Sequence, residues 1–118
     1  MATVLIVEDA PLQQALIQRF VSSAHTVVGR VETVDEAIDH ADEHEPDVVI
    51  VDISLDDGDG IAAAKRIADS NPDAEFIVST AHVGAVTQER AQAIEPAAYL
   101  TKPYAKADIL RAIEQAIE

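Results

Sequence analysis

Three acidic side chains in this sequence each follow a short apolar run, and together they could bind a divalent metal ion. Glu8 and Asp9 come directly after the run at residues 4–7. Asp52 comes directly after the run at residues 48–51. Two like charges about 4 Å apart repel by about 4 kcal/mol at an effective dielectric constant of about 20, and a bound cation removes that cost. Since Mg²⁺ prefers a few carboxylates together with water and phosphate oxygens, these residues suit a site for Mg²⁺ or Mn²⁺.

Asp52 could also react with a phosphoryl group at such a site. A carboxylate can attack phosphorus and form an aspartyl phosphate. The metal ion would neutralise charge on the transferring phosphoryl group, and the ammonium of Lys102 would assist from the other side. The Thr80 hydroxyl could donate a hydrogen bond to a phosphoryl oxygen. Chemistry of this kind accepts a phosphoryl group and later loses it to water.

Five short apolar runs alternate with five helix-like segments along the chain. The apolar runs are residues 4–7, 26–28, 48–51, 76–78 and 98–100. The helix-like segments are residues 11–22, 33–44, 59–69, 83–94 and 105–117. Most of the runs are rich in β-branched residues and are apolar throughout, which predicts strands that are covered on both faces. We therefore predict an α/β fold, a flavodoxin-like doubly wound (βα)5 domain with a parallel five-stranded sheet in the order 2-1-3-4-5 and helices on both faces.

This fold would bring the reactive side chains together. In an open parallel sheet, ligands bind beyond the carboxyl ends of the strands. Glu8, Asp9, Asp52, Thr80 and Lys102 all stand at or just after the end of a predicted strand. We therefore expect them to face one crevice.

Some of the helix-like segments carry local signals. Thr33 and Glu36 have the spacing of a capping box, in which two orphan backbone N–H groups at a helix start are satisfied reciprocally. The segment at residues 83–94 has few large apolar residues and gives the weakest helical pattern. The pattern at residues 11–22 rests on four apolar positions: Leu12, Ala15, Leu16 and Phe20.

Composition excludes several classes of protein. The chain has 118 residues, the size of one ordinary domain, with 22 acidic residues against 8 basic ones and a net charge of -14. Direct nucleic-acid binding needs a basic patch, which this balance disfavours. No apolar run is long enough to cross a bilayer, no basic segment precedes the first run, and there is no cysteine. We expect a cytoplasmic protein that contacts neither nucleic acid nor membrane.

The negative charge also predicts a response to salt. Self-repulsion destabilises the compact state, and the Debye length falls to about 3 Å at about 1 M salt. The low lysine content and the abundance of alanine resemble those of proteins from halophilic organisms. On this hypothesis we expect the melting temperature, followed by circular dichroism, to rise between low and molar KCl. A melting temperature that did not rise would contradict it.

Taken together and in this order, five stretches resemble the response regulator receiver domain of two-component signalling systems. They are Val-Leu-Ile-Val-Glu-Asp at 4–9, Pro-Asp-Val-Val-Ile-Val-Asp at 46–52, Asp-Gly-Asp-Gly at 57–60, Ser-Thr-Ala at 79–81 and Tyr-Leu-Thr-Lys-Pro at 99–103. Each stretch alone is a weak signal, whereas all five on successive strand ends form a strong one. The resemblance covers the whole length, so residues 1–118 are expected to form one receiver domain.

The resemblance implies a role for each residue of the metal and phosphoryl site. Asp52 is the expected phosphoacceptor, and Lys102 is the expected phosphoryl-binding lysine. Asp9 would bind Mg²⁺ directly, and Glu8 would act through water. The backbone carbonyl of Ser54, two residues after the acceptor, would be a further metal ligand.

The resemblance also implies a switch and its partners. Thr80 and Tyr99 would form the switch pair, Ala81 would leave room for the phosphoryl group, and the Lys102–Pro103 peptide bond is often cis in this family. A sensor histidine kinase or phosphotransfer protein would supply the phosphoryl group, as in a phosphorelay. The chain would catalyse only its own phosphorylation and dephosphorylation. Phosphorylation would change a surface made by the fourth helix, fifth strand and fifth helix, which an effector protein, an output domain or a second copy would bind.

Two other functions are weighed against this one. A haloacid-dehalogenase-type phosphatase also uses a strand-end aspartate and Mg²⁺, but it needs a second aspartate where this chain has Ser54. A pseudo-receiver, which acts as an interaction module without phosphorylation, is expected to lack Asp52 or Lys102, and this chain has both.

Other positions depart from the family pattern or leave alternatives open. Asp56 stands where many receivers have proline, and residues 95–98 lack the glycine that many receivers have shortly before the switch aromatic. His82 is either an exposed loop residue or a group that tunes the access of water to the phosphoryl group. His40 and His44 have a spacing that can bind a metal ion, although a solvated polar face is the commoner arrangement.

Overall fold

The computed structural model describes residues 1–55, 58–81 and 85–118. Within them, parallel strands form a five-stranded sheet in the order β2-β1-β3-β6-β7, which confirms the predicted order. The strands of this sheet are β1 (Thr3–Val7), β2 (Thr26–Val31), β3 (Val48–Val51), β6 (Glu75–Thr80) and β7 (Ala98–Thr101). The helices are α1 (Pro11–Ser22), α2 (Val34–His44), α3 (Gly60–Ser70), α4 (Ala85–Gln92) and α5 (Lys106–Ile117). A short antiparallel hairpin, β4 (Ser54–Leu55) and β5 (Gly58–Asp59), follows β3 and was not predicted.

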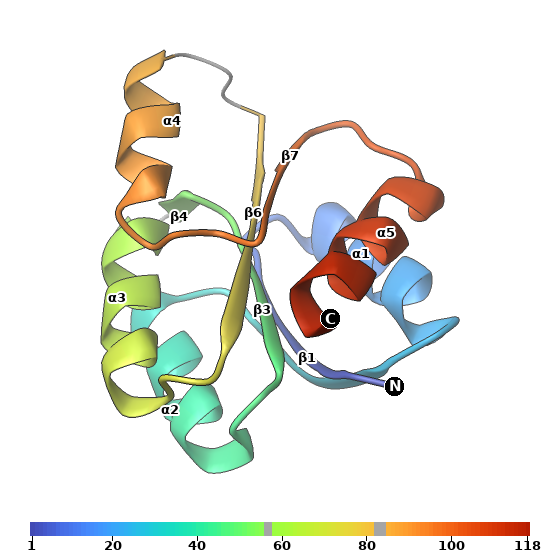
Figure 1. Cartoon of the computed structure of the whole chain (residues 1–118), viewed down its shortest axis with the longest axis horizontal. Coiled ribbons are helices and arrows are strands. Elements are labelled where there is room, and N and C mark those ends of the chain that lie inside the picture. Colours follow the sequence, from blue (N-terminus) through green and yellow to red (C-terminus); the bar gives the residue numbers. More distant parts are fainter. Residues whose placement is uncertain (56–57, 82–84) are drawn as a thin grey trace.

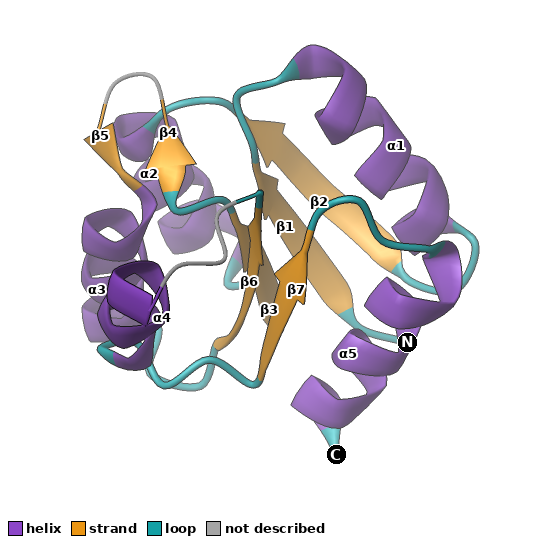
Figure 2. Cartoon of the chain, turned by 90° about the horizontal axis from the view of Figure 1, so that it is seen from above, coloured by secondary structure: helices purple, strands orange, loops and turns teal. Residues whose placement is uncertain are grey.

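Two layers of helices enclose the sheet. Figure 1 shows α1 and α5 on one face and α2 and α3 on the other, and Figure 2 shows the same layers from above. Because side chains alternate along a strand, β1 sends Val4 and Ile6 into the core beneath α1 and α5. It sends Leu5 and Val7 into the second core, beneath α2 and α3. A strand buried on both faces needs apolar residues at every position, which is why the strand signals are continuous runs.

Strand boundaries depend on pairing between strands more than on local sequence. The third strand was predicted at its observed bounds, but β2 continues through Gly29 and Arg30 to Val31. Neither Gly29 nor Arg30 has strand-like apolar character, yet both pair with β1. Likewise β6 continues through Ser79 and Thr80, two polar residues that are buried.

The buried face of α1 differs from the apolar pattern in the sequence. Its buried residues are Gln14, Ile17 and Val21, which lie three and four positions apart. Leu12 is 86% exposed and Leu16 is 40% exposed. The pattern was misleading because a polar side chain, Gln14, occupies a buried position in this helix.

Side chains cap the starts of α2 and α3. The Thr33 side chain accepts a hydrogen bond from Glu36 N at 3.2 Å, as the capping box predicts. The return contact is different, because the Glu36 carboxylate accepts from the Thr33 hydroxyl at 3.0 Å. At α3 the Asp59 side chain accepts from Ile61 N at 2.8 Å. Caps of this kind satisfy backbone N–H groups that have no partner within the helix.

The fourth helix ends at Gln92, two residues before its predicted end, and Val83 at its predicted start lies outside the described residues. Glu95 follows with a φ of 47°, in the left-handed region that favours glycine. The turn before β7 therefore has a left-handed residue although the sequence has no glycine there. Asp56 also lies outside the described residues.

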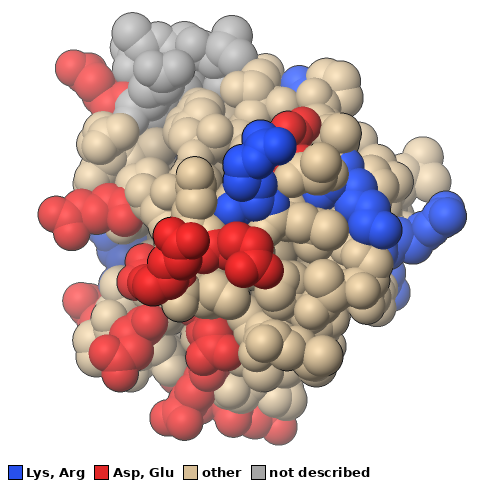
Figure 3. Space-filling view, turned by 45° about the vertical axis from the view of Figure 1, so that its right-hand side comes forward, with Lys and Arg blue, Asp and Glu red and all other residues tan. Residues whose placement is uncertain are grey.

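Charge is unevenly distributed over the surface. On the face shown in Figure 3, acidic side chains gather toward the left and the lower edge, and Lys and Arg gather toward the upper right. On this face, acidic groups therefore neighbour one another, and the salt dependence above stays a prediction. In the part of the chain that the structure describes, no helix is long and apolar enough to span a membrane.

Candidate functional site

Three carboxylates meet at the carboxyl end of the sheet, as the strand ends predicted. Glu8 and Asp9 follow β1, and Asp52 follows β3, the neighbouring strand. Each offers one carboxylate oxygen, and these oxygens all lie within 4.8 Å of one another. Glu8 is 1% exposed and Asp52 is 8% exposed, whereas Asp9 is only partly buried. The site therefore has two buried carboxylates, Glu8 and Asp52, which we call the acidic floor, and a third carboxylate, Asp9, nearer to solvent.

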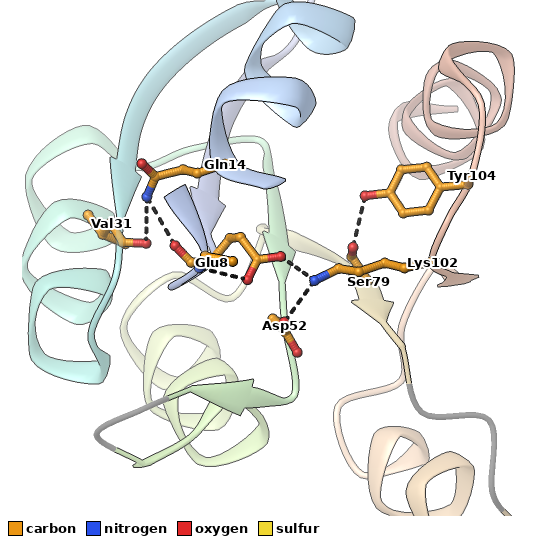
Figure 4. A network of polar contacts seen from close by, with 8 residues as sticks. Glu8, Gln14, Val31, Asp52, Ser79, Lys102 and Tyr104 are labelled. Carbon is orange, nitrogen blue, oxygen red and sulfur yellow. Dashed lines mark hydrogen bonds and ion pairs between the residues drawn. The ribbon is translucent and has the colours of Figure 1, made fainter. Parts of the chain in front are cut away.

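Lys102 reaches this floor from the segment after β7. Its Nζ donates hydrogen bonds to the carboxylates of Glu8 and Asp52, the latter at 2.9 Å (Figure 4). Its backbone N–H donates to Thr80 O at 2.7 Å, and the Lys102–Pro103 peptide bond is cis. The ammonium thus bridges two buried carboxylates that would otherwise repel each other.

Burial and charge shift the protonation of this group. Burial, helped by the neighbouring charge of Asp52, raises the pKa of Glu8, although Lys102 acts in the opposite direction. Burial opposes the charge of Lys102, yet its hydrogen bonds and charge interactions with Glu8 and Asp52 outweigh burial and raise its pKa. The lysine therefore stays protonated at neutral pH, and the ionised form of Glu8 is costly in the metal-free protein.

The metal-free protein should lose stability as pH rises through the raised pKa of Glu8. A carboxyl whose folded pKa lies above its ordinary value of 4.5 holds its proton more tightly when folded. The stability that this gives is fully present below the ordinary value of 4.5 and is lost as pH rises through the higher pKa of the folded state. In Glu8→Gln the side chain does not titrate. We expect the free energy of unfolding of the wild type, minus that of Glu8→Gln, to fall with rising pH in urea titrations with EDTA. A difference that rises or stays constant would contradict this account.

Backbone contacts hold the carboxylates in place. Glu8 N donates to Val31 O at 3.0 Å, and Gln14 Nε2 donates to Glu8 O at 3.0 Å and to Val31 O at 3.3 Å (Figure 4). Asp52 N donates to Val7 O at 3.0 Å. The first turn of α1 and the end of β2 therefore fix the position of Glu8. Gln14 was missed from the sequence, where the one available signal was a polar residue among apolar helix positions.

The proposed switch residues lie beside the site. Thr80 ends β6 and is 0% exposed. Tyr99 is half-buried in β7 and packs against the apolar cluster of Ile53, Ile61 and Val78, on the side of the sheet where α3 lies. Burial raises the pKa of Tyr99. Thr80 therefore lies at the carboxyl end of the sheet, and Tyr99 pairs with Val78 two residues before it in β6.

The other described residues singled out in the sequence lie in loops, at element ends or on α2. Ser54 begins β4, and Ala81 is exposed just past β6. His82 lies outside the described residues. The rings of His40 and His44 have centroids 5.6 Å apart. Among the described residues, the only group of three or more metal-binding side chains is the acidic one at the sheet edge, so neither histidine belongs to such a group.

The donor set fits a hard divalent cation. Glu8, Asp9 and Asp52 supply only oxygen ligands, which suit Mg²⁺ or Mn²⁺ better than softer metals. The partly exposed Asp9 leaves one side of the group accessible, and a magnesium site of this kind keeps several positions for water and phosphate oxygens. The residues present are therefore compatible with a metal ion that also contacts a phosphoryl group.

The sequence matches the family model for the response regulator receiver domain over residues 4–114. It is 37% identical over 115 residues to the transcriptional regulatory protein PdtaR of Mycobacterium tuberculosis, covering 97% of this chain and 56% of that relative. It is 33% identical to the chemotaxis protein CheY of Listeria monocytogenes, with 98% of each chain covered. The structure superposes on the signal receiver domain of a modulated diguanylate cyclase from Desulfovibrio desulfuricans with a TM-score of 0.92 and 34% identity, covering 99% of this chain and 94% of that one. The chain therefore belongs to the receiver domain family of two-component response regulators.

Proposed function

We propose that Asp52 accepts a phosphoryl group from a sensor histidine kinase or a phosphotransfer protein, in a reaction that depends on Mg²⁺ or Mn²⁺. One observation carries this proposal. The Asp52 carboxylate lies 2.9 Å from the Lys102 ammonium and belongs to the three-carboxylate group with Glu8 and Asp9. A nucleophile, an ammonium group and a set of possible metal ligands therefore lie together at the carboxyl end of β3.

Each residue has a distinct part in the proposed reaction. An Asp52 carboxylate oxygen forms a bond to phosphorus as the bond from phosphorus to the donor's leaving group breaks. When bound, the metal ion neutralises charge on the transferring phosphoryl group. Asp9, Asp52 and the Ser54 carbonyl would hold the ion, and Glu8 would act through water. Lys102 exchanges its contact with the carboxylates for a contact with a phosphoryl oxygen, which balances the added charge.

Phosphorylation would then change a binding surface. Thr80 donates a hydrogen bond to the phosphoryl group, and the resulting shift of β6 biases the packing of Tyr99 in β7. The surface formed by α4, β7 and α5 is the proposed contact for an effector protein or an output domain, and for a second copy of the chain. In this proposal the chain acts in the cytoplasm and catalyses only the gain and loss of its own phosphoryl group.

The direct test is incubation with acetyl phosphate and Mg²⁺ followed by intact-mass measurement. We expect the wild type to gain one phosphoryl group and Asp52→Asn or a metal-free sample to gain none. Asp69→Asn is the matched control because Asp69 is an exposed aspartate in α3, and it should be phosphorylated like the wild type. If the wild type gained nothing from acetyl phosphate or phosphoramidate, even at molar KCl, the chain would act as a pseudo-receiver instead.

A further inference from the structure

A pair of hydroxyl groups lies on the side of β6 away from Tyr99. The side chains of Ser79 and Tyr104 form a hydrogen bond, with Ser79 Oγ and Tyr104 Oη 2.8 Å apart (Figure 4). Ser79 is 1% exposed, and Tyr104 packs against the core beneath α1 and α5. A buried hydroxyl without a partner is costly. This pair therefore satisfies the hydroxyl groups of Ser79 and Tyr104 at the edge of the core beneath α1 and α5.

The pair fixes a segment that the sheet does not hold. The ladder between β6 and β7 ends with Thr80 and Thr101, and α5 begins only at Lys106. Between these elements, Lys102 N donates to Thr80 O at 2.7 Å. The next link to β6 is the Tyr104 hydroxyl. The segment that carries the site's ammonium is thus tied to two successive residues of β6, once through backbone and once through side chains.

The side chains of Ser79 and Thr80 lie on opposite faces of the sheet. Ile77 belongs to the core beneath α1 and α5, and Val78 belongs to the core beneath α3. Since side chains alternate, Ser79 faces the first core and Thr80 faces the second. Ser79 is therefore not placed to touch a phosphoryl group, and its hydroxyl is directed to Tyr104.

The Tyr104 hydroxyl stays protonated beside the charged site. Burial raises the pKa of Tyr104, while the Ser79 hydrogen bond and the Lys102 charge act in the opposite direction and the charges of Glu8 and Asp52 add to the increase. A neutral phenol can keep the hydrogen bond to Ser79 over the range of neutral pH.

We propose that Tyr104, held by Ser79, is a positioning residue that sets the reach of Lys102 toward Asp52 and so controls the rate of phosphoryl transfer. This inference rests on the proposed function of Asp52. Because Lys102 and Tyr104 are separated only by Pro103, a shift of the Tyr104 ring moves the start of the lysine side chain. The ammonium needs a fixed position to stabilise charge that develops during transfer. Loss of the hydroxyl pair leaves the lysine in the site but lets its position vary.

The test compares Tyr104→Phe, Ser79→Ala, their double variant and Ser79→Thr with the wild type. Phosphorylation is followed by intact mass at several acetyl phosphate concentrations and saturating Mg²⁺, and Mn²⁺ affinity is measured by electron paramagnetic resonance. We expect Tyr104→Phe and Ser79→Ala each to lower the maximal rate by about tenfold, which corresponds to the loss of one hydrogen bond that acts in the transfer step. The double variant should be no slower than either single variant, because both substitutions remove the same hydrogen bond. The half-saturating donor concentration and the Mn²⁺ Kd should change by less than about twofold, because the proposed role is in transfer and not in binding. Ser79→Thr keeps the hydroxyl and should keep the rate.

The matched control is Ser23→Ala, which removes a hydroxyl that donates to Phe20 O at 2.7 Å after α1. It should leave the rate unchanged. Circular dichroism at the assay temperature establishes that each variant is folded. If Tyr104→Phe does not fold, the contrast between Ser79→Ala and Ser79→Thr decides the question. Wild-type rates in Tyr104→Phe and Ser79→Ala, additive losses in the double variant, or equal losses in Ser79→Ala and Ser79→Thr would overturn the inference alone. No phosphorylation of the wild type would overturn the proposed function as well.

Discussion

Lys102→Met should slow phosphorylation of Asp52 by acetyl phosphate by about a hundredfold or more, the usual effect of removing one preorganised group that stabilises transferring charge. The ammonium is held between Glu8 and Asp52 before any donor arrives. It is therefore already beside Asp52 when charge develops on the phosphoryl group, and it only has to exchange its carboxylate contacts for a phosphoryl oxygen. The rate is measured by intact mass at saturating Mg²⁺, with Lys65→Met as the control. Lys65 is an exposed lysine in α3, and its replacement should not change the rate.

The same substitution should also destabilise the metal-free protein. The side chains of Lys102, Glu8 and Asp52 are 13%, 2% and 11% exposed, so the two carboxylates have little water to replace the lost cation. Removing one partner of a buried ion pair typically costs about 3 kcal/mol or more, which should appear as a lower urea midpoint above the pKa of Glu8. At lower pH the loss should shrink, because a protonated Glu8 needs no counter-charge.

Mg²⁺ provides an internal check on that explanation. In Lys102→Met the carboxylates keep their repulsion and lose the ammonium that bridges Glu8 and Asp52, so a divalent cation should bind more tightly than in the wild type. We expect Mg²⁺ to raise the urea midpoint of Lys102→Met by more than it raises that of the wild type. An equal rise in both proteins would mean that Lys102 does not compete for the charge of this site.

Strand ends made the location of the site predictable from the sequence. The apolar runs gave β1 and β3, and a parallel sheet brings the ends of neighbouring strands to one edge. Glu8 and Lys102 are 94 residues apart in the chain, yet their places at strand ends predict that both lie at this edge. What the sequence did not predict is that Lys102 bonds to Glu8 as well as to Asp52. The partners of Lys102 depend on how far its side chain extends toward each carboxylate, and residue types at strand ends do not determine this.

Contacts between elements account for the rest of what was missed. Gln14 was missed because its partners are backbone carbonyls at the ends of β1 and β2, and a helical pattern of apolar residues carries no information about them. Ser79 stands in the sequence only as part of the Ser-Thr-Ala stretch at 79–81, which does not predict its contact with Tyr104 through the turn after β7. The exposed Leu12 shows the converse case, an apolar residue that local pattern would bury and tertiary structure leaves in solvent.

Gly60→Ala should destabilise the fold by about 3 kcal/mol or more, at the upper end of the range for forcing an extra methyl group into a packed core. Gly60 begins α3, and its N–H donates to Ile53 O at 2.8 Å. A Cβ atom there would lie 1.9 Å from Asp52 O and 2.8 Å from Asp52 C. Both are backbone atoms and cannot rotate away. The helix would have to move off the strand end that carries the proposed phosphoacceptor.

Gly29→Ala is the matched control because the chain places that glycine against side chains instead. A Cβ at Gly29 would lie 2.7 Å from His40 Nδ1 and 3.1 Å from Leu5 Cδ1. Both atoms belong to side chains and not to the backbone, so we expect a loss of about 1 kcal/mol or less, partly offset by the lower entropy of the unfolded chain. Urea unfolding of both variants tests the contrast, and equal losses would contradict it. If folded Gly60→Ala is also phosphorylated more slowly than folded Gly29→Ala, then the close approach of α3 to the backbone of Asp52 is a condition of the site's geometry as well as of the fold.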